Sequence, residues 1–145
     1  MYTGFKHLHS TIALLLLIVF ALALVFHIIG LLTSSQYSKG HRVAALVGLI
    51  ASHLQLLVGL VLYFISPLGV SNLSGDTMKD SLGRLYALEH PLINIIAIAL
   101  ITIGYSKAKK ATTDKQKFTK IVVFYSLGLI LILSRIPWQT WALIN

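Results

Sequence analysis

The sequence predicts an all-α integral membrane protein, a single-domain four-helix bundle over residues 1–145 whose helices run up-down-up-down. Three observations lead to this fold class. Hydrophobic residues make up 57% of the chain and charged residues only 11%. The apolar residues gather in four stretches, each close to the ~20 residues that a helix needs to cross ~30 Å of hydrocarbon. The connectors are short, and the predicted spans are about residues 10–32, 43–65, 86–105 and 121–143.

The first two spans have boundaries that the sequence marks. The apolar run after Lys6 is longer than the core of a typical signal peptide, and no A-x-A cleavage pattern closes it. We therefore expect this run to be the first helix. A polar turn at residues 34–40 joins it to the second helix. Pro67 and Gly69, two helix breakers close together, predict the end of that second helix.

The start of the third helix has two interpretations. If Thr77 and Asp80 form a capping box, the helix begins there, outside the membrane. Pro91 would then lie inside the helix, free the carbonyl of Ala87 and bend the chain beside His90. Alternatively, the helix begins close to His90, and Pro91 takes the favoured position in its first turn. The sequence leaves both alternatives open.

Basic residues concentrate in two of the three connectors. The first connector carries Lys39 and Arg42, and the third carries six lysines against the single Asp114. The second connector, residues 66–85, mixes both signs without net charge. Because lysine and arginine in short loops stay on the cytoplasmic side, we expect both chain termini on the outer side. Trp138 and Trp141, near the end of the fourth span, fit an aromatic belt at the outer interface.

Membrane topology thereby explains the net charge of +8. We expect the lipid bilayer as a partner, with anionic headgroups near the basic connectors, and no nucleic acid. The predicted localisation is the cell's inner (cytoplasmic) membrane, as a multi-pass protein. The chain has no cysteine, which excludes disulfides, thiolate metal ligands and covalent c-type haem attachment. Any bound metal must therefore rest on histidine, carboxylate or other oxygen ligands, and any haem must be non-covalent.

Three histidines lie where a bilayer makes an ionisable side chain costly. His53 is in the middle of the second span, His90 is at the head of the third, and His9 is at the edge of the first. Such residues are rare in membranes without a partner and commonly mark function. Depth in the membrane follows from the number of residues between a side chain and the expected cytoplasmic end of its helix. This count gives depths of ~18 Å for His53, ~22 Å for Arg135 and ~24 Å for His90. His9 lies higher, at ~34 Å, and His27 lies near the inner boundary.

The pair that matches best in depth is His53 with His90. Two imidazoles from facing helices can hold the iron of a porphyrin between them. Arg135 would then bind the haem propionates, and Asn94 or Gln55 would orient a ligand ring through its second nitrogen. Small residues on the second helix would give a flat ligand room. They are Ala45, Gly48, Ser52 and Gly59.

The same residues also have a purely structural interpretation. His53 and Asn94 would then make ordinary hydrogen bonds between helices, which contribute about 0.6 kcal/mol on average. Arg135 would pair with Glu89, whose depth is similar, without any cofactor.

Four short segments carry a resemblance to small four-span bacterial membrane proteins of the cytochrome-b-like type. They are His7–Ser10, His53–Gln55 with Gly59 and Tyr63–Phe64, Glu89–Pro91 and Arg135–Trp138. More loosely, the layout is similar to cytochrome b561 and copper-resistance-D type bundles. The resemblance implies non-covalent haem b and electron transfer in a bacterial membrane. By position it makes His53 and His90 the axial metal ligands, with His9 as a third candidate. The fourth span has no histidine, so one haem is expected rather than two.

The resulting hypothesis is a membrane-embedded b-type haem protein with its haem between the second and third helices. It would pass electrons between a quinol, or a respiratory or other membrane redox complex, and a partner on the outer side. No motif identifies a substrate pocket, so electron transfer is favoured over catalysis. The alternatives are a cofactor-free assembly subunit of a membrane complex, a small porphyrin-handling oxidase, and a copper or zinc carrier. The carrier would use His7, His9, His53 and His90.

Overall fold

The protein is an all-helical bundle in a computed structural model that describes residues 1–141. Its four long helices are α1 (Tyr2–Leu32), α2 (Lys39–Ile65), α4 (His90–Lys110) and α5 (Asp114–Ser134). Four helical segments of the described chain are long and apolar enough to cross a membrane, the third being Ser81–Lys110 as a whole. The predicted all-α class and the four predicted spans are confirmed to this extent.

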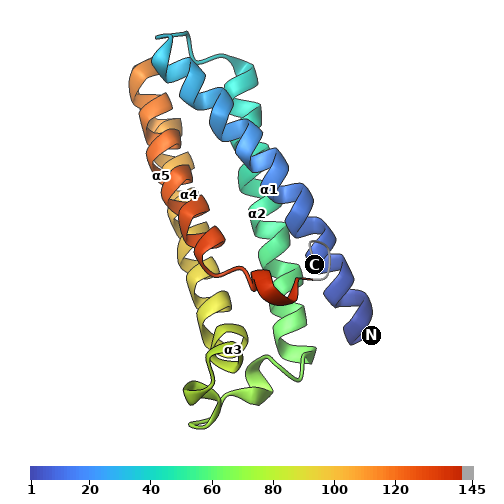
Figure 1. Cartoon of the computed structure of the whole chain (residues 1–145). Coiled ribbons are helices and arrows are strands. Elements are labelled where there is room, and N and C mark those ends of the chain that lie inside the picture. Colours follow the sequence, from blue (N-terminus) through green and yellow to red (C-terminus); the bar gives the residue numbers. More distant parts are fainter. Residues whose placement is uncertain (142–145) are drawn as a thin grey trace.

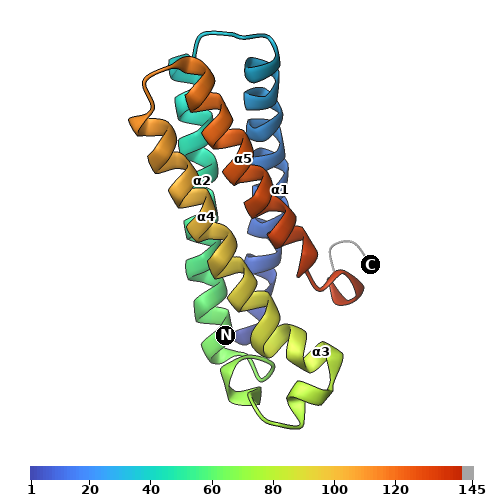
Figure 2. The same cartoon turned by 90° about the vertical axis from the view of Figure 1, so that its left-hand side faces the viewer.

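The helices form two hairpins that pack against each other. The α1–α2 hairpin lies against the α4–α5 hairpin, with α1 beside α5 and α2 beside α4 (Figures 1 and 2). Both hairpin connectors, residues 33–38 and 111–113, lie at one end, which we call the basic end. The N-terminus and the segment around α3 (Ser81–Arg84) lie toward the other end, which we call the terminal end (Figure 1).

Close helix contacts hold the centre of the bundle together. Tyr125 is fully buried, stacks on Phe20 with ring centres 5.0 Å apart, and donates a hydrogen bond to the Ala45 carbonyl at 2.7 Å. A Cβ atom added to Gly128 would lie 2.6 Å from Ile101 Cγ1, so α4 and α5 approach closely because this residue is glycine. Most long apolar side chains on the outward faces are exposed, as lipid contact requires.

The third span is not a uniform helix. Asp80 caps its start, since its side chain accepts a hydrogen bond from the Gly83 amide at 2.6 Å. The short helix α3 then leads into a π-helix over Leu85–Glu89, which ends where α4 begins at His90. Single-turn π segments inside helices are frequent at functional sites. Here the π-helix directly precedes the histidine that the sequence singled out.

Both interpretations of this region hold in part. α4 begins at His90 and has Pro91 in its first turn, as the second interpretation expected. The helical chain nevertheless continues from Ser81 through Pro91, as the first expected. The capping box of the first interpretation is wrong, because Asp80 itself is the N-cap and Thr77 lies in a separate 3-10 turn over Thr77–Lys79. Proline has no amide hydrogen to donate to the Ala87 carbonyl, and the hydroxyl of Tyr63 on α2 donates to that carbonyl instead, at 2.9 Å. The cost of the proline is thereby offset by a contact between helices.

Several predicted boundaries need correction. α1 begins at Tyr2 rather than near residue 10, so His9 lies inside a helix and not at its edge. α5 covers Asp114–Ser134 rather than 121–143. The helix ends early because Pro137 prevents it from continuing. Residues 142 and 143 of that predicted span lie outside the described residues. Trp138 and Trp141 therefore follow α5 instead of ending it.

Candidate functional site

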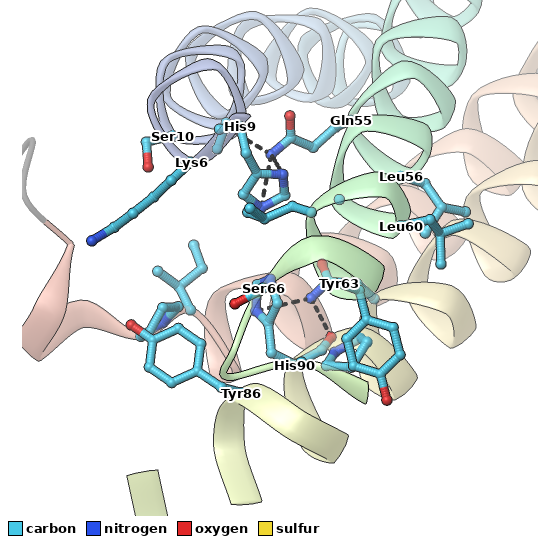
Figure 3. Close-up of a pocket in the computed structure, with 18 of the residues that line it drawn as sticks. Lys6, His9, Ser10, Gln55, Leu56, Leu60, Tyr63, Ser66, Tyr86 and His90 are labelled. Carbon is cyan, nitrogen blue, oxygen red and sulfur yellow. Dashed lines mark hydrogen bonds between the residues drawn. The ribbon is translucent and has the colours of Figure 1, made fainter. Parts of the chain in front are cut away.

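A pocket opens between the helices toward the terminal end. It holds about 190 Å³ and is lined by all four long helices and by the segment after α5. Its wall is mostly apolar, with a few polar side chains that converge from different helices (Figure 3). The polar side chains that matter below are His9, Gln55, Tyr63, His90 and Asn94. Apolar pockets with a few convergent polar groups are the usual form of a ligand site.

Two histidine rings lie close together in this pocket. His9 comes from α1 and His90 from the start of α4, and their ring centres lie 6.1 Å apart with the ring planes at 80°. Two imidazoles that bind one metal from opposite sides have centres ~6.3 Å apart, because each metal–nitrogen bond is ~2.0–2.1 Å and the ring centre lies ~1.1 Å behind the nitrogen. The observed separation therefore matches that of two rings on a common metal.

The ring of His90 is held by the end of α5. Its Nδ1 donates a hydrogen bond to the carbonyl of Arg135 at 2.7 Å. This carbonyl is free to accept because α5 ends at Ser134, and the last carbonyls of a helix have no partner within the helix. A proton on Nδ1 leaves the lone pair on Nε2. Within residues 1–141, no group hydrogen-bonds to Nε2 of His90.

The ring of His9 is held by α2. The amide nitrogen of Gln55 lies 3.1 Å from His9 Nδ1 and donates to the His9 carbonyl at 2.9 Å. One turn further along α2, a Cβ atom added to Gly59 would lie 3.0 Å from His9 Cε1, so the glycine makes room for the ring. The Oε1 atom of Gln55 is buried and has no hydrogen-bond partner in the described chain. Buried polar atoms without a partner are few in native proteins, and a ligand or water is a common explanation.

A charged cluster lies beside His90. The carboxylate of Glu89 accepts from Arg84 Nε at 2.7 Å, and its other oxygen lies 3.3 Å from Arg135 Nε. The expected Glu89–Arg135 ion pair is therefore present. Arg135 itself follows the last residue of α5 and is 44% exposed, whereas the sequence had placed it inside the fourth span. Two guanidinium groups share one carboxylate, so the cluster has a net positive charge.

Asn94 lies where the sequence expected it, one turn after His90 on α4. Its amide nitrogen donates to the His90 carbonyl at 2.7 Å and lies 3.3 Å from His90 Nδ1. The carbonyl of Arg135 is nearer to that Nδ1 and is the acceptor that orients the ring. A backbone carbonyl leaves no signal in the sequence.

His53 lies away from this pocket. Its side chain is exposed on the outside of the bundle, where Nδ1 donates to the Leu49 carbonyl at 2.9 Å. Its Nε2 is 3.5 Å from the Thr102 hydroxyl. Thr102 follows His90 by twelve residues on α4, which is ~18 Å along the helix axis. The rings of His53 and His90 are thus too far apart to share a metal ion, and this expected pair needs correction.

The error came from the depth count. That count took the third span to end near residue 106 and assumed that all cytoplasmic helix ends lie at one level. α4 runs to Lys110, one turn further, and a count along one helix does not give its axial offset from a neighbour. With the observed ends, His9 lies ~34 Å from the basic end of α1 and His90 lies ~30 Å from that of α4. The two levels agree within ~4 Å, but it is the tertiary structure that brings the two rings together.

A second histidine pair lies at the basic end. The ring centres of His27 and His41 are 5.5 Å apart, and both side chains are buried. The sequence had suggested only that His27 lies near the membrane boundary. Among residues 1–141, no group of three or more histidine, cysteine, aspartate or glutamate side chains is placed to hold a metal ion. Comparison with family models, with curated proteins and with solved structures gave no match to the chain.

Proposed function

We propose that this protein is a membrane-embedded b-type haem protein for electron transfer, with one haem held between α1 and α4 by His9 and His90. The observation that carries the proposal is the pair of rings 6.1 Å apart in one pocket, with Nε2 of His90 unbonded within the described chain. The pair replaces His53 and His90 as the proposed ligands. His53 and Thr102 would then contribute only a contact between helices.

The donor set fits a haem better than a bare metal ion. Protein-only zinc sites use three or four side-chain ligands, and the described chain offers two histidines here without a third ligand beside them. A haem iron needs only axial ligands from the protein because the porphyrin supplies the other donors. This favours the haem protein over the copper or zinc carrier.

The size of the pocket sets a condition on the proposal. At about 190 Å³ it is smaller than the ~300–1,000 Å³ of pockets that enclose a ligand of cofactor size. A porphyrin held by these two rings would therefore extend beyond the helices, or the helices would separate to admit it. Gln55 Oε1, buried and without a partner, lies in the wall that such a movement would change.

When bound, haem would supply a one-electron redox centre in the membrane. The residues of the chain would tune it by position and charge. The hydrogen bond from His90 Nδ1 to the Arg135 carbonyl fixes the orientation of the ring and raises its basicity as a ligand. Arg84 and Arg135 share the single carboxylate of Glu89, so guanidinium donors remain for the anionic propionates.

The proposed location is the cytoplasmic membrane of a bacterium, with the basic end in the cytoplasm. The support is the positive charge of the connectors at that end. The haem would then lie near the outer surface, where the terminal end opens. Proposed redox partners are a quinol in the bilayer or a larger membrane redox complex.

The visible spectrum of the protein tests the proposal. Protein purified in mild detergent is recorded in the oxidised and the dithionite-reduced state. We expect a six-coordinate low-spin b-type spectrum that is lost in both His9→Ala and His90→Ala. His53→Ala is the matched control, because it removes an intramembrane histidine outside the pocket, and it should keep the spectrum.

Two results would contradict the proposal. A folded protein that binds no haem, even when haem is added, would favour the cofactor-free assembly subunit. A spectrum lost in His53→Ala and kept in His9→Ala would show that haem is bound by other ligands.

A further inference from the structure

A second pocket lies at the basic end, far from His9 and His90. It holds about 270 Å³, well above the ~30 Å³ share of one water molecule in the liquid. The connector between α1 and α2, together with α2, α4, α5 and the residue after α4, forms its wall. Besides two alanines, the lining residues are Tyr37, Arg42, Tyr105, Lys109 and Lys117.

Three cations from three helices converge on this pocket. They are Arg42 on α2, Lys109 on α4 and Lys117 on α5. The ion pairs found in residues 1–141 all involve Asp76 or Glu89, which belong to the terminal end. None of the three cations around the pocket therefore forms an ion pair within the described chain. Like charges held together repel each other, and a bound anion relieves that repulsion.

Tyr37 and Tyr105 add hydrogen-bond donors to the pocket without adding negative charge. Burial raises the pKa of Tyr37 to about 12, with a further rise from Tyr105 and an opposing effect of Arg42. Its hydroxyl therefore stays protonated near neutral pH and does not compensate the cations. The Tyr37 ring also lies 5.9 Å from Lys117 Nζ and helps to hold that ammonium by a cation–π contact. The Tyr105 hydroxyl has no hydrogen-bond partner in the described chain and is free to donate.

We propose that this pocket binds a phosphate group. Arg42 can hold two phosphate oxygens at once through its planar guanidinium, while Lys109 and Lys117 act as point charges. Tyr105 would add a neutral hydrogen bond. The ends of membrane-spanning helices lie at the level of lipid headgroups, where basic pockets between helices bind anionic lipids. The phosphate therefore comes from the headgroup of an anionic phospholipid or from a soluble phosphate compound.

The test measures phosphate binding by the full chain in a neutral detergent. One arm titrates inorganic pyrophosphate by calorimetry. The other counts retained lipid molecules by native mass spectrometry after incubation with phosphatidylglycerol or, as the zwitterionic comparison, phosphatidylcholine. Binding of phosphatidylglycerol alone identifies the headgroup as the source, and binding of pyrophosphate as well extends the site to soluble phosphates.

The decisive variant carries Arg42→Gln, Lys109→Gln and Lys117→Gln. Each charge near the surface contributes roughly a fivefold factor, so affinity should fall roughly a hundredfold. The matched control carries Lys107→Gln, Lys110→Gln and Lys115→Gln, which removes the same charge from exposed lysines at the same end. The control should lose less than about fivefold, because exposed charges that do not line the pocket are screened by water and salt.

A milder substitution tests the proposal even if the triple variant does not fold. Tyr105→Phe keeps the ring and removes only the hydroxyl, so the fold should persist while affinity falls about tenfold, as for a hydrogen bond to a charged group. Two outcomes would overturn the proposal. One is the absence of binding of any phosphate by the parent protein. The other is an equal loss in the two triple variants, because that would show diffuse attraction to the basic surface.

Discussion

The bundle holds one histidine pair at each end, and the two pairs differ in what surrounds them. At the basic end, His27 and His41 have ring centres 5.5 Å apart. His27 Nδ1 donates to the Ala23 carbonyl at 2.7 Å, and its Nε2 lies 3.4 Å from the Tyr37 hydroxyl. His41 Nδ1 accepts from the Ser38 amide at 3.2 Å. Their hydrogen-bonding needs are met largely by the chain itself.

Aromatic rings pack around that pair, and neither histidine lines the pocket at the basic end. Phe26 stacks on His41 with ring centres 3.9 Å apart, and Phe118 meets the same ring at 4.7 Å. At the terminal end, His9 and His90 are 6.1 Å apart, line a pocket, and have an unbonded Nε2 on His90 within the described chain. The comparison teaches that the separation of two imidazoles does not by itself make a site. Open space beside the rings is also required, and His9 and His90 line a pocket whereas His27 and His41 do not line the one at their end.

Removing one histidine from each pair in turn should give the largest difference between the two ends of the bundle. His90→Ala should lower haem affinity by more than about a hundredfold, since even losing a residue that only orients a ligand costs ~10–100-fold. His27→Ala should keep the spectrum and lower the free energy of unfolding by ~2–4 kcal/mol, through a cavity and broken hydrogen bonds. Haem titration and thermal unfolding in detergent measure the two effects. Haem loss in His27→Ala would contradict the comparison.

The side chain that holds His9 provides the next test. Coordination by Nε2 of His9 requires a hydrogen-bond acceptor at Nδ1, and Gln55 can supply its partnerless Oε1 by turning its amide. Gln55→Leu should therefore weaken haem binding by ~10–100-fold. Gln55→Glu, which keeps an acceptor, should bind more tightly than Gln55→Leu in the same titration. Equal affinities of the two variants would show that Gln55 does not orient the ring.

Two glycines, one beside each pair, offer a matched substitution. In Gly30→Ala, the new Cβ atom would overlap the Phe118 ring in the packed basic end. Overpacking of this kind costs ~1–3 kcal/mol of unfolding free energy, and haem binding should stay unchanged. In Gly59→Ala, the new atom lies 3.0 Å from His9 Cε1, so the haem spectrum or affinity should change instead. If Gly59→Ala changes neither the spectrum nor the affinity, His9 does not bind the cofactor.

The smallest expected effect concerns the contact that supports the start of α4. Tyr63→Phe removes the hydroxyl that donates to the Ala87 carbonyl, one turn before Pro91. The free energy of unfolding should fall by about 1 kcal/mol, the net contribution of one hydrogen bond. Tyr86→Phe is the control, since its hydroxyl bonds to exposed Thr140. A larger loss in Tyr86→Phe than in Tyr63→Phe would contradict this account.

Much of the fold was predictable because its signals are local. Runs of apolar residues indicate the spans wherever they occur, and the end of α2 at Ile65 agrees with the breakers Pro67 and Gly69. The extension of α1 back to Tyr2 was missed, because the polar residues before residue 10 resemble a connector. The π-helix over Leu85–Glu89 was missed as well, since no composition specifies it.

The sequence identified individual residues of the candidate site but not which of them lie together. The sequence singled out His9, His90, Asn94 and Arg135, and the structure brings all four near one another at the terminal end. It paired His90 with His53, however, because both seemed to lie at one depth. The Arg135 carbonyl, which holds the His90 ring, belongs to the backbone and is available only because α5 ends there.

The sequence by itself determined that the chain forms four apolar helices, that its positive charge gathers at one end, and that thiol chemistry is absent. These properties follow from composition and from the order of residues along each helix. Only the tertiary structure decided which histidines meet. The axial offset between two helices is set by packing across their interface, where Gly59 admits the ring of His9 and the end of α5 meets His90. A count along one helix contains no information about its neighbour.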